Sequence, residues 1–394
     1  MSETEGKLSF LGAGINGSLR PQMRFTTKKD GIYILTIDRI MRIGVLAPLA
    51  RPGWIEAGTN LLAGLRLGAS DINEAGGVAG RPIELLVRDT AADPDKAIAA
   101  IVEFARSGVA AIAGEFHSTV ARAAADRCHA LQIPFLCSSA VSSPLSAEPT
   151  DWVGRLAPAQ TRGWAAYADF LIRSGHRRIA VVTTPSSYWA KGIEIVRQSA
   201  SINGASVTEI AVGDLTAMRV AKAVAAERPS IVLLLVGMPD PVVSIVRAIR
   251  SSSARADFAI GAPAGQPEFA TWLRSLGIAG VGIPFLRYLP EQLTQQGKAV
   301  TAILREQLGE TPSFVALEGY DTIVTLARLL RCFDSANANI GACWRRVSFE
   351  GTRGRITFSW TPGSNVWEWP AAPIQVVERD PERPDRIRVL AQAA

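Results

Sequence analysis

Residues 81–108 read RPIELLVRDTAADPDKAIAAIVEFARSG and predict a strand followed by a helix. The run 81–89 is short and largely apolar, whereas apolar residues recur at helical spacing over 93–108. Asp93 is placed to cap the helix, and Pro94 suits its first position. This stretch therefore predicts one strand–helix unit of a parallel α/β sheet.

The same alternation extends in both directions along the chain. A strand is expected at 42–49, and the helix at 58–75 ends at Gly76-Gly77, where positive φ carries no steric cost. The pattern restarts after residue 160, with expected helices at 164–175, 188–204 and 216–228 and expected strands at 178–184, 206–212, 230–237 and 258–263. The fold class predicted from this alternation is α/β, with two doubly wound, Rossmann-like lobes.

The two ends of the chain look different. Two amphipathic helices are expected at 290–309 and 314–333, followed by short β-like pieces rich in Trp, Gly and Pro. We expect the helices to return to the first lobe and the later strands to close the second. Residues 1–40 show weak periodicity and are expected to be a poorly structured extension. Their GAGING motif at 12–17 matches a dinucleotide fingerprint, but no amphipathic helix follows it, which argues against a nucleotide site.

Composition excludes several classes of function. Hydrophobic residues make up 48% and charged residues 20% of the chain, as in a globular protein. The net charge of +6 is spread along the chain without a basic stripe, so nucleic-acid binding is not expected. The longest apolar run, at 231–238, is far below the roughly 18 residues that span a bilayer. No secretory signal is visible in the first 40 residues, so the sequence as written predicts a cytoplasmic protein without membrane insertion.

The cysteines do not predict a metal site. The four cysteines show no C-x-x-C spacing and no paired Cys/His cluster, so neither zinc nor another cofactor is expected. Cys332 and Cys343 bracket a short loop and would form a disulfide in an oxidising compartment. In a reducing cytosol they would be two small, half-buried residues, which is the interpretation that the sequence as written favours.

Residues 113–124, AGEFHSTVARAA, are the main candidate site. His117 and Ser118 would be a base and a nucleophile if the protein were a hydrolase, but adjacent residues rarely point at each other, so we expect no enzyme. The alternative is an anion site, because Ser118 and Thr119 stand where a strand ends and a helix begins. The next expected strand also ends in small polar residues. These would complete one polar cup, and they are Ser138, Ser139, Ala140 and Ser142. A simpler alternative is that these hydroxyls only cap helices.

The order of motifs resembles that of a known family. RIGVLAPL (42–49), DINEAGGVAGRPIELLVRDTAADPDKA (71–97), PSFVALEGYDTIVTLARLL (312–330) and FEGTRGRITF (349–358) are similar to the type I periplasmic solute-binding proteins of the leucine/isoleucine/valine-binding group. This resemblance implies a clamshell of two lobes joined by three hinge crossings. The implied lobes are 41–160 with 288–346, and 161–287 with 347–394.

The resemblance also implies roles for individual residues. Ser118 and the segment Ser139–Ala140 match the positions that hold the ligand's carboxylate, and Tyr188 matches a tyrosine of the second lobe that covers the ligand. Trp54 and Trp189 would supply apolar walls, with ordinary core packing as the alternative.

Three departures from the family pattern stand out. The family's first-lobe disulfide would need cysteines at Ala92 and His117, and Val141 replaces an expected hydroxyl residue, for which Ser142 would substitute. The acidic residue that receives the ligand's ammonium group would fall near Pro263, where no carboxylate exists. Two alternatives follow: either Glu115, beside the polar cup, takes that role, or the ligand is an amide, a urea-like compound or another small carboxylate.

The resemblance leads to two alternative functions. The first is a solute-binding protein that closes on an amino acid, amide or small carboxylate and delivers it to an ABC transporter permease. That role implies a periplasmic location. The second is a cytosolic ligand sensor of the amide-responsive type, which shares the fold.

Overall fold

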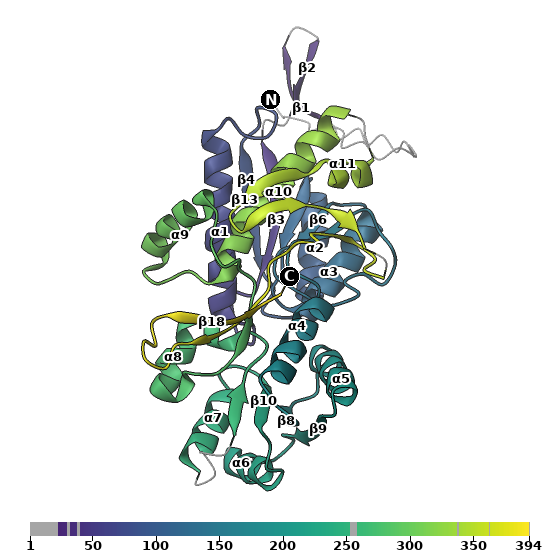
Figure 1. The fold of residues 1–394 in the computed structure, drawn as a ribbon. Helices are drawn as coiled ribbons and strands as arrows, with labels where there is room; N and C mark the ends of the chain where they lie inside the picture. Colours follow the sequence, from purple (N-terminus) through teal and green to yellow (C-terminus); the bar gives the residue numbers. More distant parts are fainter. Residues whose placement is uncertain are drawn as a thin grey trace.

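The computed structural model describes residues 23–29, 32–37, 40–252, 258–336, 339–361 and 363–393, and within these it has two α/β lobes, one above the other in Figure 1. The first lobe is built on a seven-stranded sheet in the order β15-β16-β7-β6-β5-β3-β4. The neighbours from β16 to β4 pair in parallel, and only β15 is antiparallel. The strands are β3 (Met41–Ala47), β4 (Ile83–Asp89), β5 (Ala111–Gly114), β6 (Phe135–Cys137), β7 (Val153–Arg155), β15 (Ser359–Trp360) and β16 (Trp367–Glu368).

Helices cover both faces of this sheet because its strands are apolar on both sides. In β3, Val45 and Ala47 join one core, and Leu46 between them joins another. α1 (Ile55–Glu74) and α10 (Phe314–Ala336) pack on the first face, and α2 (Pro94–Arg106) and α3 (Ser118–Leu131) pack on the second. As predicted, Asp93 caps α2, accepting a hydrogen bond from the Asp95 amide at 2.9 Å.

α1 and α10 approach each other very closely. A Cβ atom added at Gly64 would lie 1.8 Å from the carbonyl oxygen of Ala316, so only glycine fits at this contact. α9 (Gln295–Leu308) and α11 (Ile340–Arg346) complete the helices of the first lobe.

The second lobe contains a four-stranded parallel sheet in the order β11-β10-β8-β9. Its strands are β8 (Arg178–Thr183), β9 (Ser206–Ala211), β10 (Ile231–Leu235) and β11 (Ala259–Gly261). The helical elements are α4 (Gln160–Arg173), α5 (Ser187–Ile202), α6 (Ala217–Ala226), α7 (Val242–Ser251), η2 (Gln266–Glu268), α8 (Ala270–Leu276) and η3 (Gly277–Gly280). The predicted doubly wound, two-lobed fold is confirmed. The chain crosses between the lobes three times, after β7, after β12 (Phe285–Arg287) and before β17 (Gln375–Arg379).

The C-terminal strands differ from the expectation that 347–394 would close the second lobe. β15 and β16 extend the first lobe's sheet instead, because Trp367 and Trp369 are buried in that lobe's core and Trp367 Nε1 donates to Asp151 Oδ1 at 2.9 Å. β13 (Ser348–Gly351) and β14 (Gly354–Thr357) form a hairpin. β12 (Phe285–Arg287), β17 (Gln375–Arg379) and β18 (Ile387–Gln392) form a separate antiparallel sheet.

The N-terminal expectation is tested only in part. Residues 1–22, with the GAGING motif, lie outside the described residues. β1 (Met23–Lys29) and β2 (Ile32–Ile37) form an antiparallel pair, which the weak periodicity of 1–40 did not predict. In Figure 1 this pair projects from the end of the first lobe that is remote from the second.

A buried ionic cluster connects α10 to the β13–β14 turn. Arg353 Nη1 lies 3.2 Å from Glu318 Oε1, and Arg353 Nε lies 3.2 Å from Asp321 Oδ2, with all three side chains fully buried. Burial raises the pKa of Glu318 to about 7, and the charge of Arg353 opposes that rise. Arg353 also donates to the Tyr288 carbonyl at 3.4 Å, so the cluster reaches the chain crossing after β12.

Cys332 and Cys343 form a disulfide that joins α10 to α11, with their Cα atoms 5.7 Å apart. This corrects the interpretation of the two cysteines as unbonded residues. Cys128 and Cys137 are free and buried. In the part of the chain that the structure describes, no helix combines the length and the apolar character needed to cross a membrane.

Candidate functional site

A cavity of about 320 Å³ lies between the lobes, at the carboxyl ends of their strands. Both lobes contribute to its lining, as expected for a ligand site in a two-lobed α/β protein. The first lobe and the crossing after β12 provide Pro52, Trp54, Phe116, His117, Ser118, Thr119, Ser139, Val141, Tyr288 and Phe314. The second lobe provides Ser186, Tyr188, Trp189, Val236, Gly237, Met238, Ala264 and Gln266.

The start of α3 forms one polar part of the lining. β5 ends at Gly114, and α3 begins at Ser118 with no side chain capping it. The amide groups of the first helical turn have no partner within the helix, and together with the Ser118 and Thr119 hydroxyls they favour a negative charge. This end of the cavity is therefore suited to an anionic group.

The segment after β6 is divided between the cavity and the framework. Ser139 lines the cavity, whereas the Ser138 hydroxyl accepts a hydrogen bond from Thr322 at 2.9 Å. The Ala140 amide donates to the Glu115 carbonyl at 3.0 Å. Ser138, Ala140 and Ser142 are not lining residues, and the side chain at the cavity wall is Val141.

Glu115 does not face the cavity. Its carboxylate is fully buried and accepts hydrogen bonds from the Phe116 amide at 2.8 Å, the His117 amide at 3.0 Å and the Thr90 hydroxyl at 2.8 Å. Burial raises the pKa of Glu115, and these hydrogen bonds oppose the rise. Glu115 therefore holds the loop that leads into α3. The expectation that it would meet a cationic ligand group does not fit this geometry.

His117 links two loops of the first lobe. Its Nε2 atom accepts a hydrogen bond from the Trp54 amide at 3.1 Å, which requires the neutral imidazole. Burial lowers the pKa of His117 to about 4, so the ring stays neutral near pH 7. Because Nε2 is occupied by a backbone amide, this nitrogen does not serve as a base for Ser118.

The remaining walls are mainly aromatic. Trp54 lies 4.7 Å from Phe269 and 5.6 Å from Phe116, measured between ring centroids. Tyr188 and Trp189, on α5, lie 4.8 Å apart by the same measure. The Trp54–Phe269 contact joins the two lobes directly beside the cavity.

The described lining of this cavity contains no Asp, Glu, Lys or Arg side chain. The segment 260–267, where the resemblance placed an acidic residue, contributes Ala264 and Gln266 instead. The cavity therefore combines a neutral, aromatic interior with an anion-favouring edge at α3.

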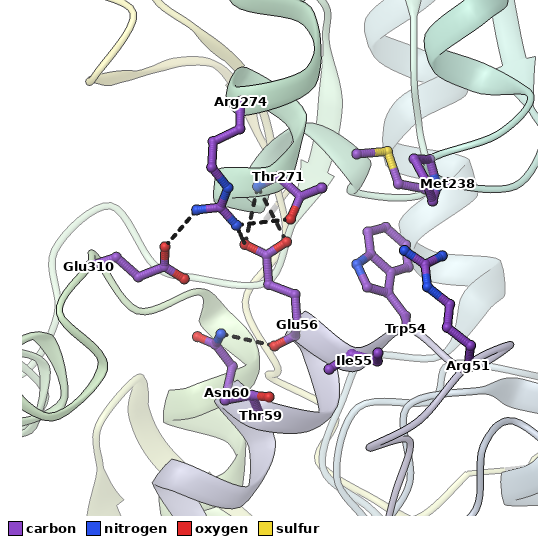
Figure 2. A pocket seen from close by; sticks show the side chains of 12 residues that line it. Arg51, Trp54, Ile55, Glu56, Thr59, Asn60, Met238, Thr271, Arg274 and Glu310 are labelled. Atoms are coloured by element: carbon purple, nitrogen blue, oxygen red, sulfur yellow. Dashed lines mark hydrogen bonds and ion pairs between the residues drawn. The ribbon is translucent and has the colours of Figure 1, made fainter.

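A second cavity of about 320 Å³ adjoins the first and shares Trp54 and Met238 with it. Figure 2 shows that its far side is crossed by polar contacts. The Glu56 carboxylate, on α1, accepts a hydrogen bond from the Thr271 amide at 3.2 Å, and Arg274 lies 3.5 Å from Glu56. Arg274 also donates to Glu310 at 3.0 Å, so α8 of the second lobe is bound to two acidic residues of the first.

The structure brings together around one cavity six residues that sequence reasoning placed in the site, and they are Trp54, Ser118, Thr119, Ser139, Tyr188 and Trp189. Sequence reasoning missed Gln266, Met238, Tyr288 and Phe314. The first two follow strands of the second lobe, so the rule used for Ser118 and Ser139 would also have found them. Tyr288 and Phe314 carry no local signal, since they reach the site through a chain crossing and the start of α10.

Solved structures of several solute-binding proteins share this fold. The leucine binding protein LivK from Thermotoga maritima has a TM-score of 0.77 and 19% identity, covering 90% of this chain and 98% of its own. LivJ from Streptococcus pneumoniae, a branched-chain amino acid transporter substrate binding protein in complex with isoleucine, has a TM-score of 0.75 and 18% identity, covering 90% and 100%. An ABC transporter solute binding protein from R. palustris, in complex with benzoate, has a TM-score of 0.74 and 19% identity, covering 90% and 96%.

No curated protein sequence matches this chain. Residues 41–374 do match a family as a whole, from the first strand of the first lobe to the last chain crossing. On this match over most of its length, the chain belongs to the periplasmic binding protein family.

Proposed function

We propose that this protein is the solute-binding component of an ABC-type transporter and that it binds a small aromatic carboxylate without catalysing a reaction. The observation that carries this proposal is the cavity between the lobes, which has aromatic walls and no charged lining residue but opens onto the uncapped start of α3. Family membership and the similar transporter proteins support the transport role.

The carboxylate is proposed to sit at the start of α3. There the Ser118 and Thr119 hydroxyls and the free amides of the first turn would donate hydrogen bonds to it. His117 would remain a neutral neighbour, because its Nε2 atom is held by the Trp54 amide.

The rest of the ligand is proposed to be an aromatic ring. Trp54, Phe116 and Tyr188 provide flat apolar surfaces, and a volume of about 320 Å³ is at the small end of the range for ligand sites. Benzoate in the R. palustris protein is a ligand of this class, whereas isoleucine in the S. pneumoniae protein also carries an ammonium group.

The lining argues against an α-amino acid for this chain. Burying an ammonium group without a carboxylate partner costs several kcal/mol of binding free energy, because the group loses its hydration. Glu115, the nearest acidic residue of the α3 loop, is already bonded to two backbone amides and the Thr90 hydroxyl.

A periplasmic location fits the disulfide between Cys332 and Cys343, because disulfides persist in oxidising compartments. We therefore propose a periplasmic location, in place of the cytoplasmic location expected from the first 40 residues.

The test is isothermal titration calorimetry of the purified protein with benzoate, benzamide, phenylalanine and leucine. We expect benzoate to bind at least about tenfold more tightly than the others, since benzamide lacks the charge and the amino acids add an unpartnered ammonium group. NMR of the recovered benzoate should show it unchanged. Tighter binding of leucine or phenylalanine would refute the aromatic-acid assignment.

A further inference from the structure

Gln266 is a buried amide in the wall that the second lobe contributes to the cavity. It is 1% exposed, and its Nε2 atom donates to the Val236 carbonyl at 3.3 Å. Because a carbonyl can only accept, this contact fixes which way the amide group is turned. The atom left for another partner is therefore the oxygen, Oε1.

Gln266 Oε1 has no hydrogen-bond partner within the described chain. A buried acceptor without a partner is costly, and native proteins rarely keep one without a reason. Its position in a cavity-lining residue suggests that the missing partner belongs to a ligand.

The backbone around Gln266 is firmly held. Arg379 Nε donates to the Pro267 carbonyl at 2.6 Å, and Arg379 Nη2 donates to the Glu268 carbonyl at 2.9 Å. The Glu268 carboxylate accepts a hydrogen bond from the Phe314 amide of the first lobe at 3.3 Å. Gln266 therefore belongs to a braced turn, as selective recognition requires.

The chemistry of the partner follows from these neighbours. The partner must be a hydrogen-bond donor, and with no carboxylate in the lining a neutral donor is preferred over a cation. The anion-favouring start of α3 lies in the first lobe, whereas Gln266 lies in the second. A ligand that spans the lobes would therefore carry its donor at the end remote from its carboxylate.

We propose that Gln266 determines specificity by accepting a hydrogen bond from a neutral hydroxyl group of the ligand, so that the preferred ligand is a ring carboxylate with a hydroxyl group opposite the carboxylate. This proposal rests on the proposed function and adds the second recognition point, in the other lobe.

The experiment compares 4-hydroxybenzoate with 4-fluorobenzoate, which is of similar size but cannot donate, and with benzoate, by calorimetry. We expect the wild-type protein to bind 4-hydroxybenzoate about tenfold more tightly than 4-fluorobenzoate. In Gln266→Met the ratio should fall close to one, because both ligands then meet the same apolar side chain. The matched control is Gln375→Met, which changes an equally buried glutamine on β17 outside the cavity and should leave the ratio unchanged.

The outcomes separate the two proposals. The role of Gln266 would be overturned if the wild-type protein bound 4-hydroxybenzoate and 4-fluorobenzoate equally well, or if Gln266→Met kept the wild-type preference. If the wild-type protein still bound benzoate, the proposed function would remain intact. Failure of all three carboxylates to bind the wild-type protein would overturn both. If Gln266→Met does not fold, the wild-type protein still provides a test. A ratio near one between the affinities for 4-hydroxybenzoate and 4-fluorobenzoate would overturn the proposal. 4-Methoxybenzoate, which also cannot donate a hydrogen bond, should bind as weakly as 4-fluorobenzoate.

Discussion

The carboxylate of Glu56 accepts a hydrogen bond from the backbone amide of Thr271 at 3.2 Å, although the two residues belong to different lobes. Glu56 stands at the start of α1 and Thr271 near the start of α8, next to the ring contact between Trp54 and Phe269. The lobes are therefore joined by the polar contact of Glu56 with Thr271, which Figure 2 shows, and by the aromatic contact of Trp54 with Phe269.

Glu56→Ala should loosen this junction. Loss of a charge-assisted hydrogen bond to a side chain that is 13% exposed is expected to cost about 1–2 kcal/mol. In the ligand-free protein we expect a larger radius of gyration by small-angle X-ray scattering and faster amide exchange in the peptide covering α8. Glu103→Ala is the control, since it breaks a carboxylate–arginine pair within the first lobe. Equal behaviour of the two variants would contradict a role for Glu56 between the lobes.

Ser118→Ala should weaken binding of the carboxylate ligand by about 1–3 kcal/mol, because the anion loses one donor at the start of α3. Calorimetry with benzoate measures this loss. Ser187→Ala changes the first residue of α5, which is not a lining residue, and should leave the affinity unchanged. Unchanged affinity in Ser118→Ala would mean that the anion binds elsewhere.

His117 should make stability depend on pH. Burial lowers its pKa from the ordinary 6.5 to about 4, so below pH 6.5 the unfolded chain takes up a proton that the folded protein does not. The stabilisation is thus fully present above pH 6.5 and is lost as the pH falls through 4, by about 3 kcal/mol in total.

His117→Gln removes that ionisation and keeps a side-chain acceptor for the Trp54 amide. Urea denaturation at pH 7, 6, 5 and 4 should show the variant losing less stability than the wild type over this interval. Parallel pH curves would show that His117 keeps an ordinary pKa in the folded protein.

Arg353→Met should destabilise the protein by about 3–5 kcal/mol, because it leaves Glu318 and Asp321 buried without their cation. Equilibrium denaturation measures the change. Adding Glu318→Gln and Asp321→Asn to the variant should restore part of the loss, since the buried negative charges are then gone. A single variant as stable as the wild type would show that the cluster is dispensable.

The α/β core was predictable because its strands and helices follow different periods. β3 is buried on both faces, and α2 carries its cap at Asp93, so each unit is recognisable in isolation. Short β-like pieces were expected around β15 and β16, but their place in the first lobe was not predictable, because it depends on buried Trp367 and Trp369. A two-residue strand has no period that sequence analysis could use.

The site was predictable where it follows the ends of strands. That rule placed Ser118 and Ser139 together, but it does not say which way a side chain points. Glu115 belongs to the same strand end and yet turns inward to bond the amides of its own loop. The disulfide likewise depends on how α11 docks on α10, which the spacing of Cys332 and Cys343 left open.

Trp54 and Met238 border both cavities, each of about 320 Å³, and Trp54 is the bulkier of the two shared side chains. A smaller side chain in place of Trp54 would enlarge the space that the two cavities share and make room for larger solutes. The range of molecules captured by a protein of this shape can therefore widen through the change of a single codon.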